Sequence, residues 1–583
     1  MISIDDIREK NTIAYGKDCI GSREAGDMDG CGNHRGRNRG QAAPAALIAG
    51  IGTASAALLR LCGRRLLLLA ICLVTLLGAT CHADSRPGMI YIPLDDRPVC
   101  YEFPVKVMEA AGYRIYTPPA KYLASREHPA NVEAIWQWLE HRAEKVQAAV
   151  ISTDTLIYGG LVPSRTHHFT QAQLDARVQR LKDLRLDSGI RFYAFSTLMR
   201  TPRESYGDME PDYYSKVGPA IFRYSQLSDK SDMDLDTVLE KYVKNALERN
   251  MVKANLKDWL ERRDKNLRVN HRLAMLGRTG RFDYFAIGKD DNAPLSHTHM
   301  EARQISLENG GTGDDTFQIL PGVDQLGLLL LTRAANEMSG TMPKVYQLYP
   351  EGPGAETVPQ YSDLPLGQSV PQQVLAAGGT IVQSPEAADI ILAVNSPADG
   401  EMRDSTDLSN QYFASPANRR YIYRIGELLD SGKTVTLADI AYSNGGDNGL
   451  MHELSLRNYT DRLAAYNGWN TADNAVGFAI AQGMLADRIS PANRTVLLQE
   501  RILDDWYYQS NARRVVTRQL EESNQVPFKY NLKDKEKSVK ATVLEEMESL
   551  AKRYPVTRDI LFDIAFPWHR LFEIDIVSLT LRK

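Results

Sequence analysis

The sequence predicts an α/β protein whose core is a mainly parallel β-sheet. Short apolar runs recur along most of the chain, a polar residue follows nearly every one, and amphipathic stretches with helical spacing separate most of them. Near-continuous apolar strands that alternate with helices are typical of a parallel sheet covered on both faces. The composition agrees with this, because 43% hydrophobic and 24% charged residues in a chain of 583 are globular values. They exclude a disordered, collagen-like or multi-span membrane protein.

Eight segments are expected to be strands, because they are short, apolar and rich in β-branched or aromatic residues. They cover residues 89–94, 146–152, 191–196, 282–287, 317–320, 344–348, 388–394 and 434–437. Eight or more such units fit a (β/α)-barrel-like arrangement. They fit equally well two doubly wound lobes divided near residue 340, and the periodicity does not separate these two alternatives.

The same patterns divide the mature chain into three parts. Residues 84–340 are expected to form the main α/β domain, which carries most of the polar strand ends, and residues 341–490 form a second α/β segment. Residues 491–583 are expected to be a helical C-terminal extension. The alternation of apolar and polar residues over 566–581 predicts a closing strand at its end.

Residues 1–83 are expected to be a leader. Two arginines precede an apolar run over 66–79, which is short for a transmembrane helix and suits the hydrophobic region of a signal peptide. We predict cleavage after Ala83; a lipid anchor at Cys81 and an uncleaved membrane anchor are the alternatives. Residues 1–60 are unusual for a signal peptide and indicate a start codon placed too early in the gene. The protein is therefore expected to be exported, periplasmic or secreted, with membrane contact only through the leader.

Cysteine usage and charge support these expectations. Five of the six cysteines lie in the first 81 residues, which leaves Cys100 as the single thiol of the predicted mature chain. An exported protein with one thiol must be stabilised by its core, since no internal disulfide is available. The formal net charge of -4 gives no general electrostatic reason to bind nucleic acid, and no nucleic-acid partner is expected.

Polar residues that follow the predicted strands are the candidates for substrate binding, because ligand sites of parallel α/β folds lie at the carboxyl ends of strands. A single Asp or Asn at such a position is often a helix cap or a turn former instead. The candidates are Asp95, Asp96, Arg97, Asp154, Arg200, Asp324, Asn444, Asp447, Trp469, Asn470 and Asn474.

The candidates for catalysis are Asp290 and Asp291, two adjacent acids that follow an apolar strand. Neighbouring like charges raise the pKa of one member, which is a property of catalytic acids. His297, His299 and Glu301 come next and could form a divalent-metal site with Asp290, but their spacing is not that of a known zinc motif. We expect no metal and no cofactor.

Several blocks of sequence stand in a fixed order over about residues 88–578. They are IPLDDRPVCYEFP, ISTDTLIYGGLVPSR, MRTP with EPDYY, GKDDNAP, PGVDQLG, NGGDN, YNGWNTADN and FPWHRLFEIDI. Together they resemble the bacterial domain of unknown function 4127 family. One departure is Gln325, which stands where the family usually has an acidic residue after the aspartate of the PG-x-D block. The family name carries no established activity, so this resemblance implies boundaries and no function.

A more distant resemblance implies a mechanism. A strand that ends in an adjacent Asp pair, with asparagines and a tryptophan from later strands, is similar to the hyaluronidase-like β-N-acetylglucosaminidases. This similarity implies that Asp290 orients the 2-acetamido group of the substrate, which attacks the anomeric carbon, and that Asp291 protonates the leaving oxygen. Asn470 and Asn474 could then bind sugar hydroxyls, and Trp469 or the tryptophan of FPWHR could stack on a sugar ring.

The sequence-based hypothesis is therefore an exported carbohydrate-active hydrolase, a substrate-assisted glycosidase that acts on N-acetylated amino sugars. Its partner would be a small-molecule or polymeric carbohydrate. Two alternatives stay open: a non-catalytic periplasmic carbohydrate-binding protein, and a metal-dependent hydrolase.

Overall fold

The computed structural model describes residues 86–142, 146–184, 189–204, 209–309 and 316–582. The predicted leader, with Cys81 and the expected cleavage after Ala83, lies outside the described residues. No described helix combines the length with the hydrophobicity that crossing a bilayer requires.

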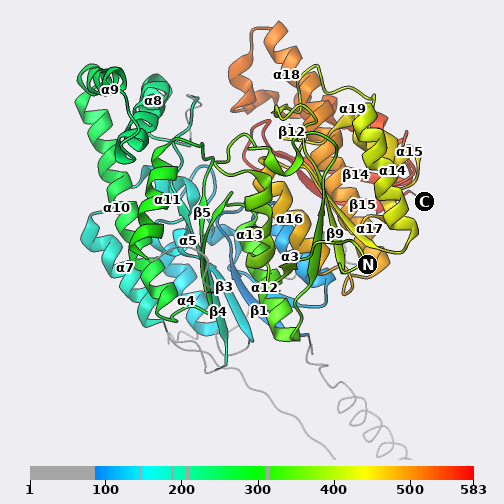
Figure 1. Ribbon diagram of the computed structural model, residues 1–583, viewed down its shortest axis with the longest axis horizontal. Helices are drawn as coiled ribbons and strands as arrows, with labels where there is room; N and C mark the ends of the chain where they lie inside the picture. The colour runs from blue at the N-terminus through cyan, green and yellow to red at the C-terminus, as the bar shows by residue number, and fades with distance from the viewer. Residues whose placement is uncertain (1–85, 143–145, 185–188, 205–208, 310–315, 583) are drawn as a thin grey trace, which may run out of the picture. The chain divides into compact units, whose positions relative to one another are not determined.

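The first half of the described chain forms a six-stranded sheet in which every strand is parallel to its neighbours (Figure 1). The strand order is β2-β1-β3-β4-β5-β6. The strands are β1 (Gly88–Ile92), β2 (Arg114–Tyr116), β3 (Ala148–Ser152), β4 (Arg191–Leu198), β5 (Tyr284–Lys289) and β6 (Phe317–Pro321).

Both faces of this sheet are buried, which explains why its strands are mainly apolar. In β1, Met89 and Tyr91 join one hydrophobic cluster, whereas Ile90 and Ile92 join another on the opposite face. Helices α3 (Glu102–Ala110) and α12 (Leu326–Ser339) contribute to the first cluster. The second includes residues of α4 (Val132–Arg142), α5 (Thr153–Ile157), α7 (Gln171–Asp183), α10 (Lys253–Arg278) and α11 (His297–Glu308).

A second parallel sheet follows, with the strand order β13-β11-β9-β7-β8. Its strands are β7 (Lys344–Leu348), β8 (Thr380–Ile381), β9 (Ile390–Asn395), β11 (Thr434–Asp439) and β13 (Ala465–Asn467). One face belongs to the cluster that holds α13 (Leu366–Ala376) and α16 (Ala472–Met484), and the other faces α14 (Pro416–Asp430) and α15 (Asn448–Leu456). The part of the chain that the structure describes therefore has two doubly wound sheets and no closed barrel.

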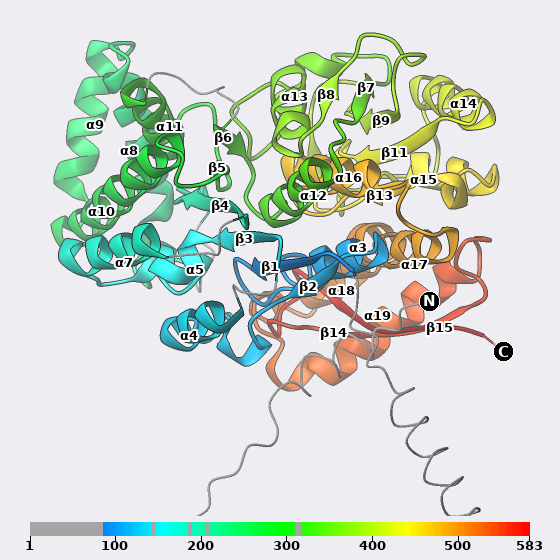
Figure 2. The same cartoon turned by 90° about the horizontal axis from the view of Figure 1, so that it is seen from below.

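Helix α12 joins the two sheets into one core. Its buried residues run without interruption from Leu326 to Asn336. It packs against α3, β3 and β4 of the first sheet and against α13 and α16 of the second (Figure 2). A helix that is apolar on all sides is expected in such a buried position. Gly340 ends it in a left-handed conformation, with φ at 65°.

A helical excursion lies between β4 and β5. It consists of α8 (Tyr214–Asp232), α9 (Val238–Asn250) and α10, and it has a small hydrophobic cluster of its own around Trp259. The short helix α6 (Leu161–Thr166) lies earlier in the chain, between α5 and α7.

The C-terminal region is mainly helical, as predicted, and it supports the second sheet. It contains α17 (Pro491–Arg501), the buried π-helix η5 (Ile502–Ala512), α18 (Arg513–Glu522) and α19 (Glu536–Ala551). Within η5, Ser510 donates to the carbonyl of Gly446 and Asp505 accepts from the amide of Gly468. These bonds fix the loops that follow β11 and β13.

The end of the chain is an antiparallel hairpin of β14 (Ile560–Ala565) and β15 (Asp575–Leu581). The segment 566–574, which we expected to begin a single closing strand, is the connection between these two strands.

We predict that Gly327→Ala in α12 destabilises the fold by about 1–3 kcal/mol, because an added Cβ would lie 2.8 Å from Cζ of the buried Tyr91. Chemical denaturation of both proteins measures the difference. Gly367→Ala in α13 is the control, since its Cβ would meet Ala355 at 3.2 Å and needs only a small adjustment. Equal losses in the two variants would contradict the close packing of α12 on β1.

Candidate functional site

Arg97 connects the carboxyl ends of the first and the last strand of the first sheet. Its Nη2 atom donates to Oδ2 of Asp95 at 2.8 Å and to Oδ1 of Asp324 at 2.7 Å, and all three side chains are almost fully buried. Asn470 and Asn474, from the loop and helix after β13, each donate through Nδ2 to Oδ2 of Asp324 at 3.4 Å. These five residues, which we call the Arg97 cluster, bring together strand ends of both sheets.

Two helix N-termini hold this cluster in place. Asp324 lies just before α12, and Asn474 lies in the first turn of α16, where its amide donates to the cap residue Thr471. The positive ends of helix dipoles favour a carboxylate at this position. Asn470 has φ at 60°, a left-handed conformation that asparagine tolerates better than most residues.

A second group of charges surrounds the predicted catalytic pair. Arg165 donates to Oδ2 of Asp290 at 2.5 Å, and Arg200 donates to Oδ2 of Asp291 at 2.5 Å. Both arginines also contact Oε1 of Glu210, at 3.4 and 2.7 Å. These five residues form the Asp290–Asp291 cluster, in which three carboxyl groups share two guanidinium groups.

Because the carboxyl groups of this cluster outnumber its guanidinium groups, one carboxyl group is favoured to keep its proton. Burial raises the pKa of Asp290 to about 6, the charge of Arg165 opposes this shift, and the charge of Asp291 adds to it. The charge of Asp324 acts in the same direction, so the two clusters influence each other electrostatically. The Asp290 side chain is 5% exposed and that of Asp291 is 24% exposed. Asp291 is therefore the member of the pair that a ligand can reach.

The turn that carries Asp291 is strained and held from both sides. Asp291 has φ at 32°, which is unusual for a residue other than glycine. The preceding Lys289 is buried and forms an ion pair with Asp363 at 2.5 Å. The following Asn292 donates its amide to the carbonyl of Tyr361 at 3.0 Å. Both partners belong to the long loop after β7, so the second sheet fixes a turn of the first.

Asp96 lies beside the Arg97 cluster and accepts a hydrogen bond from Nε1 of Trp568 at 2.8 Å. Burial raises the pKa of Asp96 to about 6, and the bond from Trp568 opposes the shift. The Trp568 ring is buried, with the guanidinium carbons of Arg97 and Arg570 at 5.2 and 4.7 Å from its centroid. These cation–π contacts occupy the ring.

Two other predicted residues have structural contacts. Asp154 is fully buried and accepts from the amide and hydroxyl of Thr197, which ties the start of α5 to β4, and burial raises its pKa to about 7. Trp469 is 1% exposed and packs edge-on against Phe572. It therefore has no exposed ring face on which a sugar could stack in this conformation.

The remaining predicted residues, Asn444 and Asp447, lie in the loop after β11. The side chain of Asn444 donates to Asp404, while its amide donates to the carbonyl of Asn470. Asp447 caps α15 by accepting from the amides that follow it, and burial raises its pKa. Neither side chain joins the two clusters described above.

Three of the four residues that could have formed a metal site have other partners, among them Asp290, which pairs with Arg165. His299 pairs with Asp229, and Glu301 forms an ion pair with Arg263. Over the ranges of the chain that the structure describes, no group of three or more His, Cys, Asp and Glu side chains has an arrangement that could hold a metal ion.

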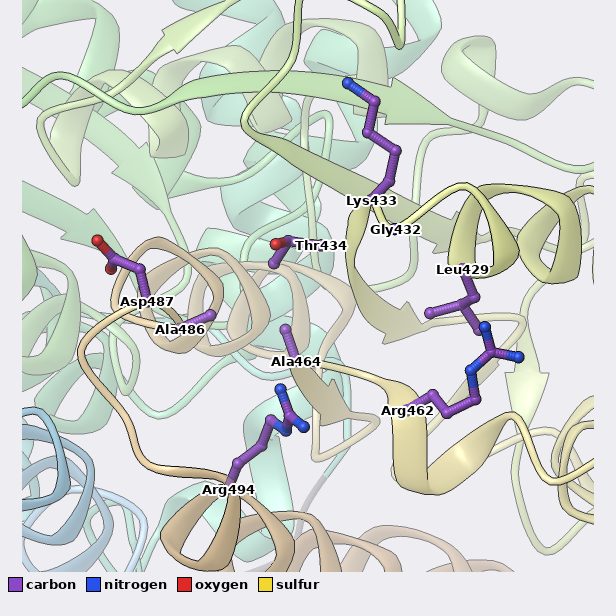
Figure 3. A pocket seen from close by; sticks show the side chains of 9 residues that line it. All are labelled: Leu429, Gly432, Lys433, Thr434, Arg462, Ala464, Ala486, Asp487 and Arg494. Carbon is purple, nitrogen blue, oxygen red and sulfur yellow. The ribbon is translucent and has the colours of Figure 1, made fainter.

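A cavity of about 230 Å³ lies at the opposite, amino-terminal edge of the second sheet (Figure 3). It is bordered by Thr434 at the start of β11 and by Ala464 just before β13. Its basic side chains are largely occupied, because Lys433 donates to backbone carbonyls and Arg462 pairs with Asp430. We therefore place the functional site at the carboxyl ends of the strands, where the titratable groups converge.

The sequence-based candidates omit four residues that lie beside these clusters: Glu210, Lys289, Tyr361 and Asp363. Glu210 and Lys289 stand within the quoted sequence blocks, and that position was the signal that could have identified them. Tyr361 and Asp363 lie outside those blocks and come to the site only through the fold.

A family model described as "Protein of unknown function (DUF4127)" matches residues 89–577. The match covers nearly all of both sheets and the C-terminal region, including every residue of the two clusters. Neither the comparison with curated proteins nor the comparison with solved structures found a match.

We predict that Arg97→Met lowers the free energy of unfolding at pH 7 by about 3–5 kcal/mol, because it leaves two buried carboxylates without their cation. The loss should be smaller at pH 5, where the orphaned carboxyl groups take up protons more readily. Arg97→Lys should recover part of the stability, since one ammonium group cannot reproduce the fork of bonds.

Urea denaturation at both pH values tests this prediction. Arg180→Met, which removes an exposed ion pair with Glu133, is the control and should cost less than about 1 kcal/mol. A loss at Arg97 no larger than that of the control would contradict the assigned role.

Proposed function

The chain belongs to the family described as proteins of unknown function (DUF4127), and we propose that it is a carbohydrate-active hydrolase whose reaction takes place at the Asp290–Asp291 cluster. One observation carries the proposal. A partly exposed carboxylate, Asp291, is held in a strained turn by Arg200 and directly adjoins a buried carboxyl group with a raised pKa. Such a pair is suited to donate a proton and then to recover it.

The proposed substrate is a glycoside of an N-acetylated amino sugar. The acetamido oxygen of the substrate attacks the anomeric carbon, and Asp291 gives its proton to the departing glycosidic oxygen. Water then attacks the cyclic intermediate, and Asp291 takes up the proton that this water releases. Arg165 and Arg200 keep the two carboxyl groups in place during both steps. This route needs one acid and base at the bond that breaks, which distinguishes it from glycosidases with two separated carboxyl groups.

The charge balance of the site supports a neutral substrate. The two clusters and Asp96 contribute six carboxyl groups, and the cations bound to them are three arginines: Arg97, Arg165 and Arg200. Each arginine is already paired with acids, so none is free to clamp an anionic ligand. Asn470, which is only partly buried, offers a carboxamide for sugar hydroxyls. Export remains part of the proposal and rests on the sequence of residues 66–83.

We predict that Asp291→Asn lowers kcat for aryl N-acetyl-hexosaminides by about 10²–10⁴-fold, because the amide cannot carry the proton. Steady-state kinetics of the wild type and the variant measure this effect. Asp264→Asn is the matched control, since Asp264 is an exposed aspartate that pairs with Arg268 on α10.

Three outcomes decide between the candidate functions. Loss of turnover in Asp291→Asn, with Asp264→Asn active, supports the hydrolase. Equal activity in the wild type and Asp291→Asn removes the proposed acid. Carbohydrate binding without turnover in the wild type, retained in Asp291→Asn, would replace the hydrolase with a carbohydrate-binding protein.

We also predict that kcat falls as the pH rises through about 6, because the pair then loses the proton that the leaving oxygen needs. Glu210→Gln should move this decline to lower pH. The substitution removes a carboxylate that pairs with both Arg165 and Arg200. The two arginines then stabilise the negative charges of Asp290 and Asp291 more strongly. The pH dependence of kcat measures the shift, and Glu261→Gln on α10 serves as a control with an exposed partner. A shift toward higher pH would contradict the assigned charge sharing.

A further inference from the structure

Tyr361 lies on the loop after β7 and is bound to the turn that carries the proposed catalytic pair. Its carbonyl accepts the amide of Asn292 at 3.0 Å. Two residues further along the same loop, Asp363 forms the buried ion pair with Lys289. The position of Tyr361 relative to Asp291 is therefore fixed by contacts on both sides of the turn.

The phenol group of Tyr361 interacts electrostatically with charges at and beside the proposed site. Burial raises the pKa of Tyr361 to about 12, and the charges of Asp291, Glu204 and Asp404 add to the shift, while Arg200 opposes it. The hydroxyl is therefore protonated at neutral pH.

The ring of Tyr361 is nevertheless available to a ligand. The residue is 41% exposed. Among the described residues, no aromatic or cationic side chain stacks on its ring, and no hydrogen bond to its hydroxyl is formed. Trp469 and Trp568, the stacking candidates from the sequence, are 1% and 3% exposed.

The backbone of Tyr361 is strained. Its φ is 64°, in the left-handed region that large side chains avoid. Most other described non-glycine residues with positive φ are asparagine or aspartate, which adopt this conformation more readily than tyrosine does. A bulky residue in such a conformation destabilises the fold. Since no ring partner in the described chain offsets this cost, the strain points to a ligand.

We propose that Tyr361 is a substrate-binding residue that stacks on the apolar face of the sugar ring held at Asp291. The inference rests on the proposed function and adds a residue to it. Aromatic rings gain contact with apolar C–H groups at little cost in conformational freedom. Because Tyr361 belongs to the second sheet and Asp291 to the first, the sugar would contact loops of both sheets.

Three variants test the proposal. Tyr361→Asn removes the ring and suits the left-handed backbone, so it should raise KM by about 10-fold or more and leave kcat within a few-fold. Its thermal midpoint should equal or exceed that of the wild type, because the strain is relieved. Tyr361→Phe keeps the ring and should restore most of the lost affinity. Tyr423→Asn is the control, since Tyr423 is 66% exposed on α14.

Two results would overturn the proposal while leaving the hydrolase intact. The first is an unchanged KM in Tyr361→Asn. The second is a lowered thermal midpoint with a parallel loss of kcat, which would indicate a structural role.

If the wild type hydrolyses no N-acetyl-hexosaminide, the proposed function fails, and the stacking role is then decided by calorimetric titration with chitotriose. Binding by the wild type and by Asp291→Asn, weakened about 10-fold or more in Tyr361→Asn, supports the role of Tyr361. Absence of binding to the wild type, or equal binding by all three proteins, overturns it.

Discussion

The fold depends on the buried ion pairs of Arg97 with Asp95 and Asp324. To meet Arg97, the chain after β6 must return across the carboxyl edge of the first sheet to the end of β1. This return places α12 against α3 and β3, and α12 in turn supports α13 and α16 of the second sheet. The desolvated charges alone add little net stability. The ion pairs instead specify how these segments are arranged in the fold, because few other groups could pair with the buried carboxylates.

The same charge pattern links stability to pH. Asp96, Asp154 and Asp290 have pKa values that burial raises to about 6, 7 and 6. Each folded-state pKa lies above the unfolded value near 4, so the folded chain holds protons that the unfolded chain has already released. The stability that these groups contribute is complete below that unfolded value and is lost as the pH rises through 6 and 7. These three groups therefore contribute stability in mildly acidic conditions that they no longer contribute above pH 7.

The sequence predicted elements that are long and apolar, and it missed those whose existence depends on tertiary pairing. All eight expected strands are present, whereas β8 has two residues and β13 three, too few for a period to be visible. The choice between a barrel and two sheets depended on the path of α12, which no local pattern encodes. Asp290 and Asp291 could be found because they adjoin in sequence. Their arginine partners could not be assigned, since Arg165 is 125 residues from Asp290.

Strain and burial together indicate a preformed site. Asp291 and Tyr361 both have left-handed backbones, and the bond from Asn292 to Tyr361 joins the two strained segments. The ion pair of Lys289 with Asp363 and the continuous core around α12 hold these segments together. If the site formed only when the protein closed around a ligand, the backbone strain would be absent before closure. Here the surrounding structure holds the strained backbone in place. Under the proposed function, a substrate would therefore meet groups that are already oriented, which lowers the reorganisation needed to reach the transition state.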